Sequence, residues 1–302
     1  NLKYPLYSLS KNSNFFLTIN FCNLYKFKPG YSYDLGDNKI ETNYHSIEEL
    51  GIWMYNLQTE KIKKIISAED LGVNNKDFWI EHINISPDNF NFIFLLREKL
   101  KDGGINTSFY LSDINKSKLF KINNSGRASH FNWFNENEFI VYGGLENYAN
   151  KLRKNKFLQK LPFNRLLLSI YHKFIKHNSN LSKKITGDCY FIYNINNLTH
   201  KKINSQLLNL EDGHPSIDTK INRYLLTDIY SDLPAKKPKL LILDLYSNQI
   251  IYEISFDSIK QLDNSPFRCD LHPRFLDNEL LFSIDCFINN RRAFKVFKFI
   301  NE

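Results

Sequence analysis

The chain has 302 residues, of which 42% are hydrophobic and 15% aromatic, and its net charge at neutral pH is +8. This length and apolar content suffice for a sizeable core and suit β-structure. No uncharged apolar run approaches the roughly 18 residues of a membrane span, and four cysteines without CxxC spacing are too few for a disulfide scaffold, which favours free thiols in a reducing compartment.

Short apolar segments recur along the chain in groups of up to four, separated by Asx-rich turns and loops of variable length. The first group holds Leu6–Ser10, Ile52–Leu57 and Ile62–Ile66. The second begins at His82 and continues through Phe92–Leu96, Phe109–Ile114 and Leu119–Ile122. The third begins at His130 and continues through Phe139–Tyr142 and Tyr190–Ile195. The fourth begins at His214 and continues through Tyr224–Thr227, Leu241–Leu245 and Ile250–Ile254. The fifth begins at His272 and holds Leu280–Ser283 and Phe294–Phe297.

A four-stranded repeat of about 40–50 residues is typical of a β-propeller blade, in which radial repetition hides most strand edges. The predicted fold class is therefore all-β, a β-propeller of four-stranded blades, five of which are visible in a single domain over residues 1–302. A β-sandwich with repeated SPDN-like turns is the alternative.

Four of the eight histidines occupy the same position of the repeat, at the start of a predicted first strand. They are His82, His130, His214 and His272. The first strand of a blade is innermost, and the loop joining its second and third strands emerges at the end where the first strand begins. These loops are the variable ones, at 21–50, 97–108, 143–188, 230–239 and 286–292. Long loops on a rigid scaffold commonly carry function, so we expect the imidazoles to converge on a metal ion or an anionic ligand. For each single histidine, a hydrogen bond to a neighbouring blade is the structural alternative.

Acidic and basic side chains gather around the last two of these histidines. Carboxylates at Asp212, Asp228 and Asp270 are candidates to complete a metal shell, although turn formation also accounts for Asp212 and Asp270. Arg268 and Arg274 are suited to holding a carboxylate with two hydrogen bonds. The side chains predicted to end second strands and face the same rim are Asp228, Tyr230 and Asp285. We assign substrate binding to Arg274, Asp228 and Asp285.

Residues 145–185 contain ten basic residues and one acidic residue, a net charge of +9, whereas the remainder of the chain sums to −1. Apolar residues recur with helical spacing on both sides of Pro162, which predicts a basic helical hairpin inserted into the propeller. Packing as a lid is one interpretation, and docking on an anionic membrane surface or glycan is the other. Because the body of the protein is neutral, nucleic-acid binding is not expected.

The segments DGHPS…LLTDIY (212–230) and RCDLHPRF…SID (268–285) resemble a bacterial propeller family related to oligogalacturonate lyases. The motifs YPLYSLS, KPGYSYD, HINISPD and SHFNW extend this resemblance over most of residues 4–300 outside the insert. The resemblance implies a seven-bladed, manganese-dependent enzyme with histidine ligands that cleaves uronate glycans by β-elimination. Such families have further blades before the YPLYSLS-like strand, and the fifth group here lacks a fourth strand, so we expect five blades of a seven-bladed ring rather than a closed five-bladed one.

Carried over by position, the resemblance implies metal ligands at His214 and His272 and then His130, to which we add Asp270. Manganese is expected ahead of calcium, zinc or iron. The resemblance places Arg268 on the substrate carboxylate, where it would stabilise enolate-like charge. Tyr230 or His130 would take the proton, while the metal would acidify the adjacent C–H bond.

The leading functional hypothesis is thus a metal-dependent, lyase-like enzyme acting on an acidic glycan. The alternative is a non-catalytic glycan-binding or scaffolding propeller in polysaccharide assembly. A WD40-type or serine-hydrolase function is disfavoured because the chain has neither a Gly-His…Trp-Asp repeat nor GxSxG. The expected location is the cytoplasm, with membrane-peripheral attachment through the insert, and a periplasmic location stays open because the first residue is Asn1 and not Met.

Overall fold

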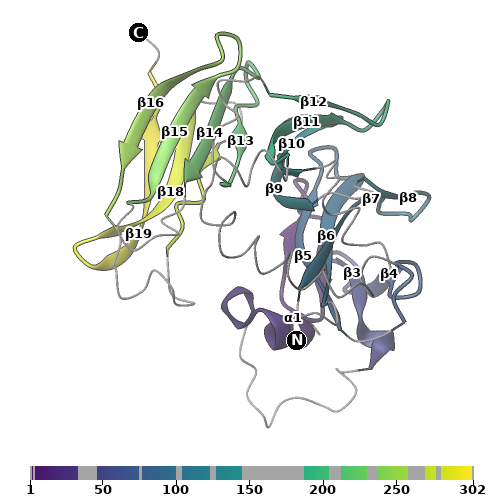
Figure 1. The fold of residues 1–302 in the computed structure, drawn as a ribbon. Coiled ribbons are helices and arrows are strands. Elements are labelled where there is room, and N and C mark those ends of the chain that lie inside the picture. Colours follow the sequence, from purple (N-terminus) through teal and green to yellow (C-terminus); the bar gives the residue numbers. More distant parts are fainter. Residues whose placement is uncertain are drawn as a thin grey trace, which may run out of the picture. The chain divides into compact units, whose positions relative to one another are not determined.

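The computed structural model describes residues 2, 4–32, 46–74, 77–99, 104–122, 127–144, 187–203, 212–229, 237–257, 269–276 and 280–300. Within these residues the chain forms five antiparallel sheets, each a simple meander of consecutive strands (Figure 1). The sheets fall into two compact units. Residues up to Ile122 hold two sheets, and residues from Asn123 onward hold three. The predicted insert at 145–185 lies outside the described residues, and the prediction of one domain over 1–302 stays a prediction.

The first unit consists of two four-stranded sheets. The first sheet comprises β1 (Ser8–Leu9), β2 (Phe15–Ile19), β3 (Gly51–Asn56) and β4 (Ile62–Ser67). The second comprises β5 (Phe78–Ile85), β6 (Asn91–Lys99), β7 (Ile105–Asp113) and β8 (Leu119–Lys121). The first strands of the two sheets, β1 and β5, lie beside each other, as they do in consecutive blades of a propeller.

A short helix lies between β2 and β3, where the sequence predicted only a loop. Helix α1 (Phe21–Phe27) begins after Asn20, whose side-chain oxygen accepts a hydrogen bond from the N–H of Asn23 at 3.1 Å. The side-chain amide of Asn23 donates to the carbonyl of Phe78 at 2.8 Å and so attaches α1 to β5. The 3₁₀ turns η1 (Pro29–Tyr31) and η4 (Ile47–Glu49) complete the described part of this connection.

The second unit contains the other three sheets. One comprises β9 (Arg127–Trp133), β10 (Glu138–Gly144), β11 (Cys189–Asn194) and β12 (Thr199–Lys202). The next comprises β13 (Ser216–Ile217), β14 (Tyr224–Ile229), β15 (Lys239–Asp244) and β16 (Gln249–Ser255). The last has only β17 (Arg274–Phe275), β18 (Leu281–Ile288) and β19 (Arg291–Lys298), so its predicted lack of a fourth strand is confirmed within the described residues.

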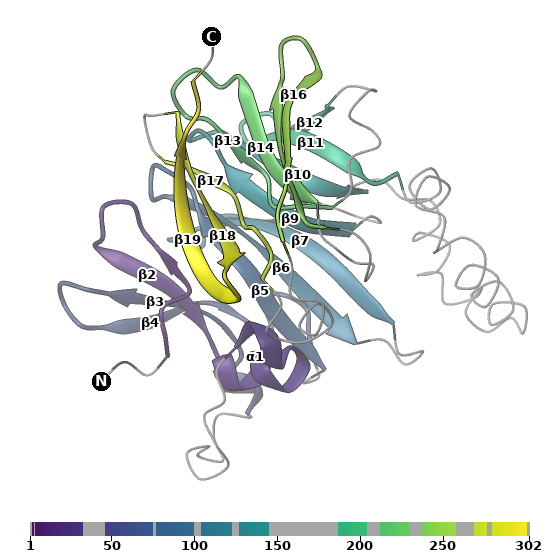
Figure 2. The same ribbon diagram turned by 90° about the vertical axis from the view of Figure 1, so that its left-hand side faces the viewer.

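The sheets of the second unit pack face to face around their first strands. Strand β13 has β9 on one side and β17 on the other. On β14, Leu225 packs in a cluster with Ile140 and Tyr142 of one neighbouring sheet, while Leu226 packs with Phe282 and Ile284 of the other. A strand covered on both faces takes apolar residues at successive positions, which explains the apolar runs at 224–226 of β14 and 240–243 of β15. The predicted all-β fold built from propeller blades is confirmed (Figure 2).

Two of the predicted variable loops are wrong, because the strands extend through them. Residues 97–108 lie largely in β6 and β7, which pair as far out as Lys99 and Ile105. Residues 286–292 form the end of the β18–β19 hairpin, in which only Asn289 and Asn290 are unpaired. Both asparagines have positive φ, 49° and 60°, as a two-residue type I′ turn requires.

Two of the four repeat histidines do not begin their strands, as the sequence had predicted, but lie inside them. His130 is inside β9, and His82 is inside β5 at a register shift between Glu81 and Asn84. His214 and His272 do precede their strands. Among the described residues, no helix is long and apolar enough to cross a membrane.

Candidate functional site

Three of the four repeat histidines meet in the second unit, each from a different blade. The ring centroids of His130 and His214 are 4.3 Å apart, and those of His214 and His272 are 4.0 Å apart. The rings are tilted by 56° and 47°, and the His214 ring contacts both of the others. We call these three residues the histidine cluster.

A single buried carboxylate holds two of the three histidines. Asp228, near the end of β14, is 1% exposed. Its Oδ1 accepts the backbone N–H of His214 at 2.7 Å, and its Oδ2 accepts the backbone N–H of His272 at 3.2 Å. The same carboxylate lies 3.0 Å from Nδ1 of His214. Burial opposes ionisation of Asp228, but the adjacent His214 and His272 outweigh it and lower the carboxyl pKa.

Glycine at position 213 is what lets the His214 loop approach β14. A Cβ atom on Gly213 would lie 1.9 Å from the carbonyl oxygen of Asp228 and 2.8 Å from Oγ1 of Thr227. Backbone-to-backbone contact this close excludes every other residue type unless the loop moves away. The D-G-H sequence therefore places His214 directly against Asp228.

His130 is held by Asp212, the residue just before Gly213. Its Nδ1 lies 3.0 Å from Oδ1 of Asp212 and 3.1 Å from the hydroxyl of Ser129. Burial again opposes ionisation of Asp212, yet His130 and nearby Arg127 hold the pKa of this carboxyl below its usual value. Arg127 itself forms a two-pronged ion pair with the buried Asp188, at 2.6 Å between Nη2 and Oδ2.

His272 is held by its own loop in a conformation that histidine rarely adopts. Its φ is +40°, in the left-handed region, which costs an L-residue about 1–2 kcal/mol. Its Nδ1 lies 3.1 Å from the carbonyl oxygen of Asp270 and 3.6 Å from Oδ2 of Asp285. Burial, reinforced by the neighbouring His214, lowers the pKa of His272 to about 3, so this imidazole is neutral at physiological pH.

In all three rings the Nδ1 atom faces an oxygen acceptor. Ionised carboxylates and backbone carbonyls can only accept, so Nδ1 carries a proton, and the neutral form of each ring has its lone pair on Nε2. An imidazole oriented by a carboxylate or carbonyl behind it is the usual arrangement of a metal-binding histidine. The residue types therefore fit a transition-metal ion of the manganese, iron or zinc kind.

The present arrangement is not that of an assembled metal centre. Among the described residues, no group of three or more His, Cys, Asp or Glu side chains is disposed to hold one ion. The donors fit a metal in kind, but the three rings would have to separate from their mutual contact to share one.

The other predicted site residues differ in how close they lie to the histidine cluster and in how exposed they are. Asp285 lies in the middle of β18 rather than at a strand end, with its side chain half exposed beside His272. Arg274 is exposed at the start of β17. Asp228 is too deeply buried to contact a substrate, so its role is to hold His214 and His272 in place. Arg268 and Tyr230 lie outside the described residues.

His82 belongs to the first unit and has its own surroundings there. Its φ is +55°, its backbone N–H donates to the hydroxyl of Tyr7 at 2.7 Å, and its Nε2 lies 3.7 Å from the buried carboxylate of Glu81. Glu81 in turn accepts hydrogen bonds from the indole of Trp79, at 2.8 Å, and from Arg97.

Sequence reasoning missed the residues that support the cluster. Ser129, Arg127 and Asp188 were not singled out, and Asp212 was considered as a ligand rather than as the partner of His130. The proximity of Asp212 to Gly213-His214 was a usable signal. The pairing of Arg127 with Asp188, 61 residues apart, has no local signature.

No protein-family model matches the chain, and no curated protein sequence matches it. Several solved structures have a similar backbone. A prolyl endopeptidase aligns with a TM-score of 0.49 and 9% identity over 99% of this chain, which spans only 36% of that protein. The β-propeller domain of the Trilobed protease from Pyrococcus furiosus aligns with a TM-score of 0.47 and 11% identity, over 98% of this chain and 67% of that one. Hadza microbial sialidase Hz136 aligns with a TM-score of 0.39 and 8% identity, over 84% and 45%.

These similarities concern the course of the backbone alone. The activities of those proteins are not carried over to this chain. The fold of this chain is that of propeller blades. The resemblance to oligogalacturonate lyases rests on the sequence motifs alone, and these comparisons do not support it.

Proposed function

We propose that the histidine cluster binds a divalent transition-metal ion and that the protein is a lyase-like enzyme acting on an acidic, uronate-type glycan. One observation carries this proposal: three imidazoles from three consecutive blades lie in ring contact, each with its Nδ1 on an oxygen acceptor. A cluster whose members serve only to bind neighbouring blades has no need to bring three rings together.

The charges around the histidine cluster favour a cation over an anion as its direct ligand. Asp212 and Asp228 stay ionised behind His130 and His214, while His272 stays neutral. A positive ion at the Nε2 side of the rings would be stabilised by both carboxylates. Manganese is proposed as the ion because of the resemblance to oligogalacturonate lyases.

The roles of this chain's residues follow from β-elimination chemistry. A base removes the proton beside the uronate carboxylate, the C–O bond to the departing sugar breaks, and a C=C bond forms, while the departing sugar oxygen takes up a proton from water. A divalent metal would neutralise the carboxylate and make that proton more acidic. Tyr230 is proposed as the base where all three histidines hold the metal, and His130 is the base in the alternative in which only His214 and His272 hold it. Arg268 with Arg274 would hold the carboxylate.

The test is the metal content of the purified protein by elemental mass spectrometry, before and after incubation with Mn²⁺ and desalting. The wild type should retain a stoichiometric ion, and the double variant His214→Ala/His272→Ala should lose it. His200→Ala is the matched control, because His200 lies on the exposed edge strand β12 in ring contact with Phe191. A wild type that stays empty after Mn²⁺ addition would refute the metal site.

Metal-loaded protein should then be incubated with a panel of polyuronates, and unsaturated products should be followed by their ultraviolet absorbance. Product formation that is lost in the histidine double variant supports the lyase. Stoichiometric metal without product on any acidic glycan would reject catalysis and leave a glycan-binding or scaffolding propeller, for which glycan binding by the wild type is the decisive measurement.

A further inference from the structure

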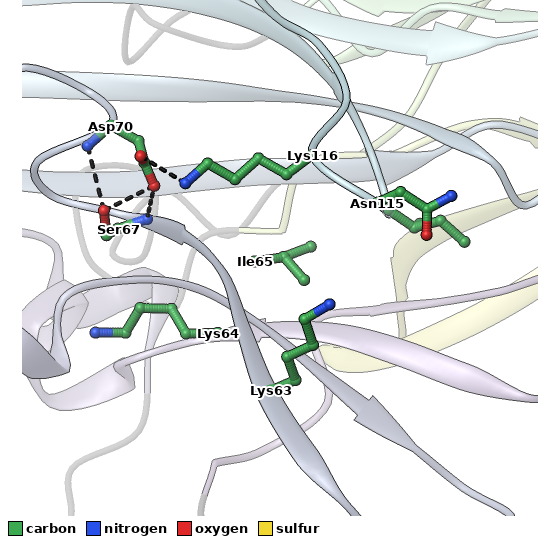
Figure 3. Close-up of a pocket in the computed structure, with 8 residues that line it drawn as sticks. Lys63, Lys64, Ile65, Ser67, Asp70, Asn115 and Lys116 are labelled. Carbon is green, nitrogen blue, oxygen red and sulfur yellow. Dashed lines mark hydrogen bonds and ion pairs between the residues drawn. The ribbon is translucent and has the colours of Figure 1, made fainter.

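The first unit contains a basic cavity that the proposed function does not use. It has a volume of about 190 Å³ and lies between strand β4 of the first blade and the turn joining β7 to β8 of the second. Its lining residues are Lys63, Lys64, Ile65, Ser67, Asp70, Ile114, Asn115 and Lys116 (Figure 3). A single water needs roughly 10–15 Å³, so this cavity has room for a polyatomic group.

The lining is positively charged, with three lysines and one aspartate among its eight residues. Lys64 is committed elsewhere: its ammonium donates to the carbonyl of Glu48 and lies 4.7 Å from the ring centre of Trp53. The side chains of Lys63 and Lys64 leave β4 in different directions (Figure 3). Lys63 is exposed, and among the described residues no acid forms an ion pair with it.

The one carboxylate of the cavity is occupied by neighbouring donors. Asp70 Oδ1 lies 2.6 Å from Nζ of Lys116, and Oδ2 accepts the backbone N–H and the hydroxyl of Ser67 at 2.8 and 2.7 Å. Burial opposes ionisation of Asp70, but Lys116 and Ser67 lower its pKa below the usual value. Asp70 therefore acts as an anchor that holds the Lys116 ammonium at the cavity.

A second carboxylate fixes the turn from which Asn115 and Lys116 project. Asp113 is fully buried and accepts the backbone N–H groups of Asn115, Ser117 and Lys118 at 2.9, 3.1 and 2.9 Å. It also accepts the hydroxyl of Ser117 at 2.6 Å. Both turns around the cavity are thus held by buried or half-buried carboxylates, so the Lys116 ammonium is in place before any ligand arrives, whereas the exposed side chain of Lys63 is free to move toward it.

We propose that this cavity binds one phosphate or sulfate group between the ammoniums of Lys63 and Lys116. These donors come from two separate elements on two blades, and a tetrahedral oxyanion has acceptor oxygens in several directions to meet them. Lysine binds such groups as a point charge. A metal cation is disfavoured, because the only carboxylate is already bonded to Lys116 and two further ammoniums stand nearby.

The test is isothermal titration calorimetry of the intact chain at low salt with four probes: inorganic phosphate, inorganic sulfate, glucose 6-phosphate and glucuronate. Phosphate or sulfate should bind with one site, and Lys63→Gln and Lys116→Gln should each weaken binding by about tenfold or more. Lys63→Arg should retain most of the affinity. Lys61→Gln is the matched control, because it makes the same charge change two residues from Lys63 and outside the cavity.

Tighter binding of glucose 6-phosphate than of inorganic phosphate would identify a phosphorylated saccharide as the source of the group, and the reverse order would identify the free anion. Equal weakening by Lys61→Gln and Lys63→Gln would show non-specific attraction and overturn the proposal. So would glucuronate binding as tightly as phosphate, or no binding of any probe. These measurements need no metal, so they are independent of the histidine cluster.

Discussion

His214 is bonded to Asp228 twice, once through its backbone N–H and once through its ring. The N–H reaches Oδ1 at 2.7 Å and Nδ1 reaches Oδ2 at 3.0 Å. The backbone bond fixes where the loop sits, and the ring bond fixes how the imidazole is turned and which nitrogen carries the proton. Because Asp228 also accepts the N–H of His272, one carboxylate orients residues from two blades.

Replacing Asp228 by asparagine should weaken metal binding by about 10–100-fold, as loss of a supporting carboxylate usually does. The amide oxygen can still accept one of the two backbone N–H groups, so the fold should persist. The amide nitrogen cannot accept the other, and the negative charge behind the His214 ring is lost. Titration with Mn²⁺ by calorimetry checks this, with circular dichroism to monitor folding. Asp257→Asn, on a carboxylate whose side chain is 82% exposed, should leave the affinity unchanged. Unaltered binding in Asp228→Asn would contradict the role assigned to this pair.

Gly213→Ala should disrupt the histidine cluster, because its Cβ would collide with the backbone of β14 at 1.9 Å. The loop must move, and a forced contact of this kind costs about 1–3 kcal/mol of unfolding free energy. Gly72→Ala is the control: unlike Gly213, Gly72 has a positive φ, 67°, and nothing lies within 4 Å of its Cβ position. Gly72→Ala should therefore cost only the backbone strain, about 1 kcal/mol, and leave Mn²⁺ binding intact. Urea unfolding and metal titration of both variants separate the two effects.

The blades were predictable from sequence because their signals are local. An apolar segment, an Asx-rich turn and a second apolar segment lie within about 15 residues of one another in the order in which they pair. The Ser86 turn shows why: the Ser86 hydroxyl donates to the carbonyl of Asn91 at 2.8 Å and accepts the N–H of the same residue at 2.8 Å. The convergence of three histidines was also visible, since equivalent positions of a repeat fall at equivalent places in the fold.

The wrong predictions concern segments whose conformation is decided by tertiary contacts. Arg97, Glu98 and Thr107 have the composition of a loop, yet β6 and β7 continue through them because Arg97 bonds the buried Glu81 and the hydroxyl of Thr107. The positions of His82 and His130 within their strands depend on a bulge and on pairing partners that no local pattern specifies. For the same reason, the supporting role of Asp228 emerged only from the folded chain.

Acid should unfold the protein partly through Asp244. Its two-pronged pair with Arg223, at 2.6 and 3.1 Å, lowers the carboxyl pKa to about 2, against roughly 3.9 in an unfolded chain. As pH falls below about 4 the unfolded state takes up this proton first, so the stability contributed by Asp244 is complete above pH 4 and disappears as pH falls through 2. Asp244→Asn should be less stable at pH 7 and should lose less stability between pH 4 and 2. Urea midpoints at several pH values test this, and parallel curves for wild type and variant would contradict it.

The hairpin between β18 and β19 should be sensitive to a single β-branched residue at its tip. Asn290 has a φ of 60° and Asn289 a φ of 49°, the pair of left-handed residues on which a type I′ turn depends. Valine disfavours this region, so Asn290→Val should lower the unfolding free energy by about 1–2 kcal/mol. Asn290→Gly should be neutral or slightly stabilising, because glycine enters this region without strain.

Arg291→Val is the control for the change in size and polarity, since Arg291 is exposed and begins the regular part of β19. An exposed strand position away from special backbone geometry should change stability by less than about 0.5 kcal/mol. Equal losses in Asn290→Val and Arg291→Val would show that the backbone conformation of the turn is not what matters there. A loss confined to Asn290→Val, reversed in Asn290→Gly, would establish that the turn sets the pairing in which Ile284 and Asp285 of β18 lie opposite Lys295 and Phe294 of β19.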